Sequence, residues 1–176
     1  MRFDEVLRTW SSFLEAEGIR YALAGGNALV AWGHHRPTHD ADFAVDGTHR
    51  ERIVAHAESL GYQTTFASEG YSNHHHPDHD FGHVDFLYLY DTTAETLLVD
   101  APRMRTMGLE LPVLRPEHLI AMKVRAMKQR PMRVLIDAPD IAYLLGLPGI
   151  DRERVREYFS RHGLLKIYDE LEKERR

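Results

Sequence analysis

The segment from Leu23 to Val45, LAGGNALVAWGHHRPTHDADFAV, decides the fold that this sequence predicts. A short apolar run ends at Gly25 and Gly26, and a stretch of helix-forming composition follows it. A second strand is expected from Asp40, with Asp42 two residues further along. Because strand residues two apart point to the same side, the two carboxylates are expected to lie together. The order is strand, glycine turn, helix and acidic strand.

Apolar spacing on either side of this segment predicts the remaining elements. A helix is expected near the N-terminus and others are expected later, over residues 3–14, 49–60, 116–127, 138–145, 152–159 and 164–172. Strands are expected over residues 62–67 and 83–90, with a hairpin over 104–114 and a polar, histidine-rich loop over 72–83. The fold class is therefore α+β, a mixed sheet flanked by helices. Residues 1–115 are expected to form the αβ core, and 116–176 a C-terminal helical part packed on it.

Composition excludes several classes of protein. The chain has 176 residues, a formal net charge of −5 and no cysteine, which excludes disulfide frameworks, zinc–thiolate sites and cysteine nucleophiles. It has no apolar run of the roughly 20 residues that span a bilayer, and its charged first residues are unlike a signal peptide. A cytoplasmic protein with no membrane partner is expected.

Positive charge is concentrated in one segment. Residues 101–133 hold eight Lys or Arg against two Glu, a net +6 that leaves −11 for the rest of the chain. The segment is either a surface for an anionic ligand or a set of solvated helix faces.

A third carboxylate lies in the strongest strand candidate. Asp85 occurs in the middle of HVDFLYLY, where burial of a charge requires a cation or several hydrogen-bond donors. If this strand neighbours the one that begins at Asp40, the three carboxylates form a cluster that holds two metal ions for in-line displacement at phosphorus. The alternative is a salt bridge between Asp85 and a buried arginine.

The glycine pair has two interpretations. Gly25 and Gly26 follow a strand and open a helix, so their backbone N–H groups suit an anion such as phosphate. The sequence is neither a Walker loop nor the spaced dinucleotide fingerprint. The alternative is a tight turn.

The arrangement resembles the nucleotidyltransferase superfamily related to DNA polymerase β. Arg36-Pro37-Thr38-His39-Asp40-Ala41-Asp42 is similar to the front motif of small AbiEii-type and related minimal nucleotidyltransferases. Lys123, followed by Asp137-Ala138-Pro139-Asp140-Ile141, is similar to their later motif, and the resemblance extends from Ala22 to Leu145. It implies a nucleotidyltransferase-like mixed sheet.

The resemblance also implies a reaction and its residues. A nucleoside monophosphate would pass from a nucleoside triphosphate to an acceptor hydroxyl, with two Mg²⁺ ions as cofactors. The implied catalytic and metal-binding residues are Asp40, Asp42 and Asp85. The implied nucleotide-binding residues are Gly25, Gly26, Arg36, Thr38 and Lys123, with Asn27, Asp137 and Asp140 as further candidates.

The acceptor and the biological role are expectations of the same kind. RNA such as tRNA is the first candidate because the +6 segment suits a nucleic-acid backbone. A protein is the second candidate and an aminoglycoside-like small molecule the third. Some relatives are toxins of toxin–antitoxin pairs, so an antitoxin protein is a candidate partner.

Three alternatives stay open. The first is a non-catalytic nucleotide- or partner-binding module on the same scaffold. The second is a transition-metal site in the loop that contains His74, His75, His76, His79 and His83. The third concerns Asp137 alone, which would cap a helix whose first turn contains Pro139.

Overall fold

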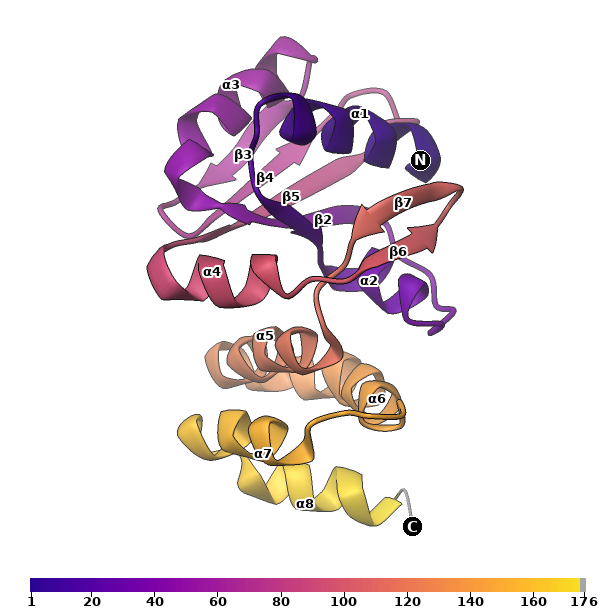
Figure 1. Ribbon diagram of the computed structural model, residues 1–176, viewed down its shortest axis with the longest axis vertical. Helices are drawn as coiled ribbons and strands as arrows, with labels where there is room; N and C mark the ends of the chain where they lie inside the picture. Colours follow the sequence, from indigo (N-terminus) through magenta and orange to yellow (C-terminus); the bar gives the residue numbers. More distant parts are fainter. Residues whose placement is uncertain (175–176) are drawn as a thin grey trace. The chain divides into compact units, whose positions relative to one another are not determined.

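The structure is a computed structural model in which residues 1–174 are described. The chain forms two compact units, Met1–Leu114 and Arg115–Arg176. The first contains all the strands of the described residues, and the second is helical (Figure 1). The α+β class expected from the sequence is confirmed.

The first unit is built on a mixed sheet. Its strands are β1 (Tyr21–Leu23), β2 (Asp40–Asp46), β3 (Gln63–Ala67), β4 (Tyr71–His75) and β5 (His83–Leu89), with a separate hairpin of β6 (Arg103–Thr106) and β7 (Leu109–Pro112). Its helices are α1 (Phe3–Ala16), α2 (Gly25–Ala31), α3 (Arg50–Ser59) and α4 (Asp91–Val99), with a short 3₁₀ turn at Gly47–His49. The strand order is β1-β2-β5-β4-β3, in which β2 and β5 are parallel and the other neighbours antiparallel.

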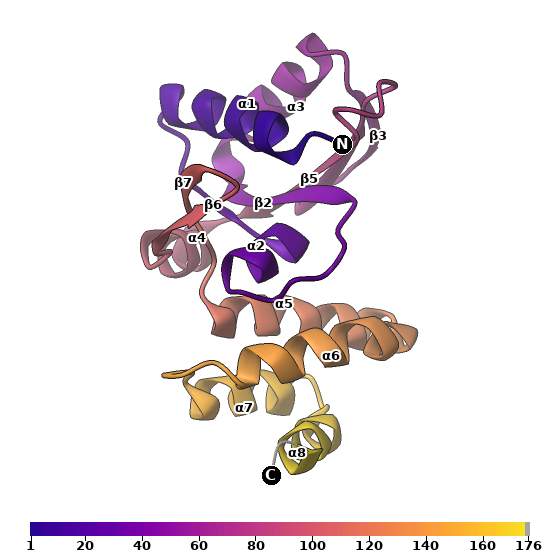
Figure 2. The same ribbon diagram turned by 90° about the vertical axis from the view of Figure 1, so that its right-hand side faces the viewer.

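Helices lie on both faces of this sheet. Helices α1 and α3 lie on one face, and α2 and α4 lie on the other (Figures 1 and 2). The face toward α1 and α3 is the apolar core, where the Trp10 ring of α1 lies 4.8 Å from Phe86 and 5.8 Å from Tyr62 between centroids. Phe43 and Phe86 stack side by side on neighbouring strands, and both are fully buried.

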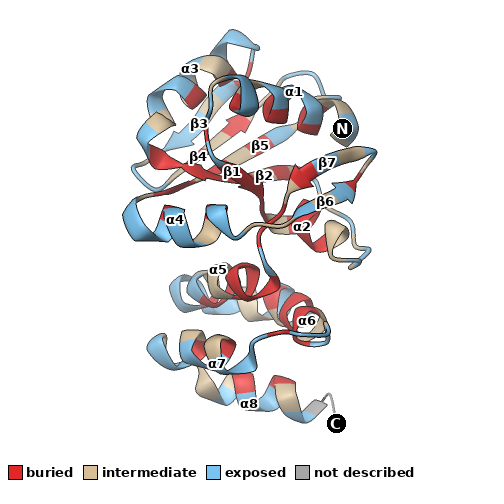
Figure 3. Cartoon of the chain, viewed as in Figure 1, coloured by how far each residue is buried: buried red, intermediate tan, exposed pale blue. Residues whose placement is uncertain are grey.

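Burial alternates along β4 and β5, as a half-covered sheet requires (Figure 3). Val84, Phe86 and Tyr88 are buried, whereas Asp85 and Leu87 between them are of intermediate exposure. The sequence predicts a buried, central strand here. Its central position is confirmed, but its second face is only half buried because the sheet carries polar side chains there.

The histidine-rich stretch is partly strand, so the prediction of a loop over 72–83 is wrong for residues 72–75, which belong to β4, and is confirmed for residues 76–82, which join β4 to β5. Strand β4 pairs with both β3 and β5, and His74 points into the core with no exposed surface. Its ring nitrogens bond the hydroxyls of Ser72 at 2.8 Å and Thr64 at 3.2 Å, and burial lowers the pKa of His74. Neutral imidazole with two hydroxyl partners is an ordinary buried polar group.

The second unit is a set of helices: α5 (Pro116–Gln129), α6 (Val134–Leu145), α7 (Arg152–Arg161) and α8 (Leu165–Glu174), with a 3₁₀ turn at Pro131–Arg133. Helix α5 packs against α6 and α7, and α8 packs against α7 through Phe159 and Tyr168, whose ring centroids are 5.4 Å apart. Pro116 occupies the first turn of α5, where its missing N–H removes no helical hydrogen bond.

Two helices differ from the prediction. Helix α4 was not predicted, and α6 begins four residues earlier than expected, at Val134. None of the helices in residues 1–174 combines the length and the apolar character that a membrane span needs.

Candidate active site

Two carboxylates face each other at the middle of the sheet. Strands β2 and β5 are parallel neighbours, and the register places Asp42 directly opposite Asp85 and Asp40 opposite His83. Paired residues on neighbouring strands point to the same face. The three aspartates therefore share the face opposite α1 and α3. This adjacency of the two strands is what the three-carboxylate interpretation required.

The glycine turn is pressed against one of these carboxylates. Gly25 has a φ of +52°, and a Cβ at this position would overlap the Asp42 carboxylate. The backbone N–H of Ala24 also donates to the Asp42 carbonyl at 2.9 Å. Only glycine combines this backbone conformation with room for the Asp42 side chain. The first reason for glycine here is thus the close approach of the turn to the acidic strand.

The next residues tie the same turn to the start of β2. A Cβ on Gly26 would overlap the Thr38 side chain, whose hydroxyl donates to the Asp40 carbonyl at 3.3 Å. Asn27 donates to the same carbonyl at 2.9 Å and is fully buried. Arg36 belongs to the segment that joins α2 to β2 and is half buried. Contacts therefore join the turn at Gly25, Gly26 and Asn27 to the segment from Thr38 to Asp42.

Asp85 is held by two neutral donors from β4 rather than by an arginine. The Tyr71 hydroxyl donates to Asp85 Oδ2 at 2.8 Å, and the Asn73 amide donates to Oδ1 at 2.7 Å. Burial raises the pKa of Asp85, the charge of Asp40 raises it further, and the two donors offset part of the shift. Burial and the bond to Asp85 also raise the pKa of Tyr71, so its hydroxyl stays protonated.

The chemistry of these side chains fits magnesium. Asp40, Asp42 and Asp85 offer only oxygen donors, and Mg²⁺ is bound in proteins through one or two carboxylates together with substrate phosphates. Two like charges opposite each other are stabilised when a cation shares them. Within residues 1–174, however, no three acidic or histidine side chains are placed to hold one ion together. The cluster of three converging carboxylates thus stays a prediction.

The histidines of residues 74–83 likewise form no group of three that could hold one ion in the described part of the chain. His74 is in the core, and His76 accepts from the Asp78 backbone N–H at 3.0 Å. These contacts give the transition-metal interpretation no support in the described part of the chain.

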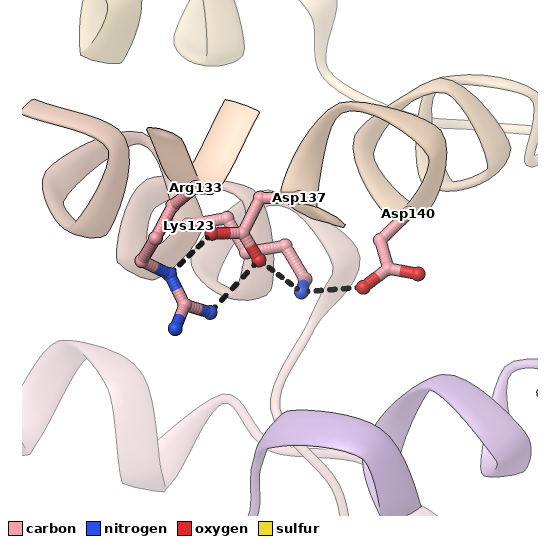
Figure 4. Close-up of polar contacts among 4 residues, drawn as sticks. All are labelled: Lys123, Arg133, Asp137 and Asp140. Carbon is pink, nitrogen blue, oxygen red and sulfur yellow. Dashed lines mark hydrogen bonds and ion pairs between the residues drawn. The ribbon is translucent and has the colours of Figure 1, made fainter. Parts of the chain in front are cut away.

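The later motif forms a cluster inside the second unit (Figure 4). Lys123 Nζ on α5 donates to Asp137 at 3.0 Å and to Asp140 at 2.6 Å, both on α6. Arg133 donates to both oxygens of Asp137, at 2.7 and 3.1 Å. The side chains of Asp137 and Asp140 are 0% and 2% exposed. The lysine expected to neutralise pyrophosphate therefore has two carboxylates as partners in its own unit.

The capping hypothesis for Asp137 is wrong. Helix α6 begins at Val134, so Asp137 lies in its first turn rather than before it, and Pro139 lies inside the helix. Burial alone would raise the pKa of Asp137, but the bonds from Arg133 and the charge of Lys123 lower it below its ordinary value.

Sequence reasoning missed Tyr71 and Asn73. Both lie in β4, at the border of the stretch that was predicted to be a loop. The signal that would have found them is the alternation of Tyr71, Asn73 and His75 with the buried Ser72 and His74.

Comparison with known proteins gives a fold and no sequence family. No family model and no curated protein matches the sequence. Several solved structures match in fold, among them the following three. The antibiotic-resistance factor ANT(2'')-Ia is 14% identical with a TM-score of 0.68, over 99% of this chain and 98% of its own.

The other two are similar at the same level. The lincosamide antibiotic adenylyltransferase LnuA, with lincomycin bound, is 17% identical with a TM-score of 0.55, over 66% of this chain and 82% of its own. An antigenic nucleotidyltransferase-like protein from Paracoccidioides brasiliensis is 16% identical with a TM-score of 0.59, over 98% of this chain and 91% of its own. The nucleotidyltransferase-like fold expected from the sequence is confirmed, whereas the narrower assignment to AbiEii-type toxins stays a prediction.

Replacing Gly25 by alanine tests the contact between the turn and Asp42. Gly25→Ala is expected to lower the free energy of unfolding by about 1–3 kcal/mol more than Gly18→Ala, because only the former places a methyl group on the Asp42 carboxylate. Gly18 is the matched control, since its φ is +65° and a Cβ there meets no atom within 4 Å. Urea unfolding of the two variants measures the difference. Equal losses would contradict the close approach.

Removing the Lys123 charge tests the buried cluster. Lys123→Met is expected to lower the free energy of unfolding by about 3–5 kcal/mol at pH 7, because two buried carboxylates lose a cation. Lys128→Met is the control, since Lys128 is exposed on the same helix. Unfolding is followed by circular dichroism in denaturant.

The difference in unfolding free energy between wild type and Lys123→Met should depend on pH in a definite direction. Folding lowers the pKa of Asp137, so its ionised carboxylate stabilises the folded state at pH values above the ordinary pKa near 4. This stabilisation is lost as the pH falls through the lower pKa that Asp137 has in the folded state. The gap in unfolding free energy between wild type and Lys123→Met should therefore narrow as the pH falls below about 4, where Asp137 takes up a proton. A gap that does not depend on pH would show that the lysine acts through packing alone.

Proposed function

We propose that this protein is a Mg²⁺-dependent nucleotidyltransferase that moves a nucleoside monophosphate from a nucleoside triphosphate to a hydroxyl group of an acceptor. The observation that carries the proposal is the register of β2 and β5, in which Asp42 faces Asp85 beside the glycine turn at Gly25. The fold shared with ANT(2'')-Ia and LnuA supports the same activity.

Each part of the site has a role in the proposed reaction. Backbone N–H groups of Gly25 and Gly26 bind phosphate oxygens at the open end of α2. Thr38 and Asn27 fix the strand that carries Asp40, and Arg36 is the arginine of the front motif. When bound, Mg²⁺ would be held by the aspartates and would supply charge neutralisation at the phosphates.

The reaction itself is a displacement at the α-phosphorus. The acceptor hydroxyl oxygen forms a bond to phosphorus, the bond to the pyrophosphate oxygen breaks, and the hydroxyl proton passes to the Asp85 carboxylate. Lys123 is not part of the proposed nucleotide site, because Asp137 and Asp140 already bind its ammonium group.

For the acceptor we propose a small hydroxylated molecule, with ATP as the nucleotide donor. The lincosamide enzyme is an adenylyltransferase with lincomycin bound, and ANT(2'')-Ia has been solved with adenylyl-2''-tobramycin. RNA, the first candidate from the sequence, loses part of its support. The +6 segment is divided between the two units, Arg103 lies near Glu15 and Glu110, and Lys123 and Arg133 bind Asp137.

Transfer of label from nucleotide to acceptor tests this function. Purified protein is incubated with Mg²⁺, each α-labelled nucleoside triphosphate in turn, and a panel of hydroxylated antibiotics, total RNA or cell protein. Label is expected on a small molecule from ATP, and Asp42→Ala should reduce the rate by at least about 1,000-fold because it removes a carboxylate at the reacting phosphate. The matched control is Asp100→Ala, an exposed aspartate after α4.

The assay also separates the alternatives. Label on RNA or on protein would support the acceptors first expected from the sequence and overturn the small-molecule assignment. Nucleotide binding without transfer to any acceptor would support the non-catalytic module and overturn the enzyme.

A further inference from the structure

Asp40, Asp42 and Asp85 form an acidic face on the side of the sheet opposite α1 and α3. The Asp85 carboxylate accepts two hydrogen bonds from side chains of β4. Asn73 is the cross-strand partner of Asp85, and Tyr71 lies two residues away on the same face, opposite Leu87. Diagonal neighbours on one face of an antiparallel pair are within reach of a long aromatic side chain. The antiparallel pairing of β4 with β5 thus brings both side chains to the same carboxylate.

The three side chains form a closed ring of hydrogen bonds. Asn73 Nδ2 donates to Asp85 Oδ1 and to the Tyr71 hydroxyl, each at 2.7 Å, and that hydroxyl donates to Asp85 Oδ2 at 2.8 Å. Each carboxylate oxygen therefore has one donor on its β4 side. A carboxylate offers about four lone-pair sites, so both oxygens keep acceptor capacity for a proton or a cation.

Electrostatics explains why such a ring is needed. Asp85 is half buried, faces Asp42 in register, and is also repelled by the charge of Asp40. Like charges in this arrangement repel each other, and the two donors from β4 oppose a rotation of the Asp85 carboxylate away from its neighbours. Two fixed hydrogen bonds set the orientation of the carboxylate before nucleotide and acceptor arrive.

We propose that Tyr71 and Asn73 are positioning residues for the proposed reaction, which hold the Asp85 carboxylate in a fixed orientation toward the site of the reaction. This inference rests on the proposed function. It makes β4, which the sequence did not predict as a strand, part of the candidate active site.

Kinetics of single variants provides the first test. Tyr71→Phe and Asn73→Ala are expected to lower kcat by about 10- to 100-fold, the effect of a small misplacement of a catalytic group, with KM for the nucleotide changed less than about twofold. The control is Tyr88→Phe, which removes a buried hydroxyl that bonds Ser72 at 2.7 Å on the covered face of the same strands. It should leave kcat within about twofold of the wild type.

A double-mutant cycle provides a second test, which measures stability and does not depend on enzymatic activity. The shift in melting temperature caused by Tyr71→Phe is measured in the wild type and in Asp85→Ala. If the hydroxyl acts through the carboxylate, the two shifts differ, because the partner is missing in the second background. Equal shifts would mean that Tyr71 acts independently of Asp85 and would overturn the proposal.

The outcomes separate this inference from the proposed function. A wild type that transfers label while Tyr71→Phe and Asn73→Ala keep full kcat overturns the positioning role and leaves the nucleotidyltransferase standing. A parallel rise in KM with no loss of kcat also overturns it, since it indicates a change in nucleotide binding. A wild type that transfers label to no acceptor overturns the proposed function, whatever the variants do.

Discussion

The parallel pairing of β2 with β5 is the constraint on which the candidate site depends. It places Asp42 directly opposite Asp85, and the period of two along each strand turns both carboxylates away from the core that Phe43 and Phe86 form. A shift of the register by one residue would move the carboxylates into that core, where they would lack solvent and donors. The apolar packing of α1 and α3 on one face therefore fixes the acidic group on the other.

Local features of the site could be predicted from the sequence because they lie close together in the chain. The glycine turn, the Asp40–Asp42 pair and the strand with Asp85 each have a short-range pattern, and the structure places the turn against Asp42. The partners of Asp85 could not be predicted in the same way. They depend on which strand pairs with β5 and in which register, and the polar composition of residues 71–75 hides that strand.

The second unit illustrates a different limit. Its helices were predicted from their apolar spacing, but Pro139 was interpreted as the first turn of a helix that begins earlier, at Val134. Pro139 lies on the exposed side of α6, where a carbonyl that loses its helical partner is able to bond water. The sequence also could not say that Lys123 would meet Asp137 and Asp140, since this needs the packing of α5 against α6. In such a buried cluster the attraction between the ions is offset by the cost of removing them from water, whereas the loss of one partner leaves an uncompensated charge.

The charge balance of the first unit bears on the metal requirement of the proposed reaction. Residues 1–114 hold 8 Lys or Arg and 17 Asp or Glu, a net charge of 8 − 17 = −9, against +4 for the rest of the chain. A nucleoside triphosphate adds further negative charge to a face that already carries three aspartates, and like charges at such distances repel strongly when partly buried. Two cations of the second unit, Lys123 and Arg133, are bound to Asp137. In the proposed reaction, divalent cations that arrive with the nucleotide would supply the missing positive charge.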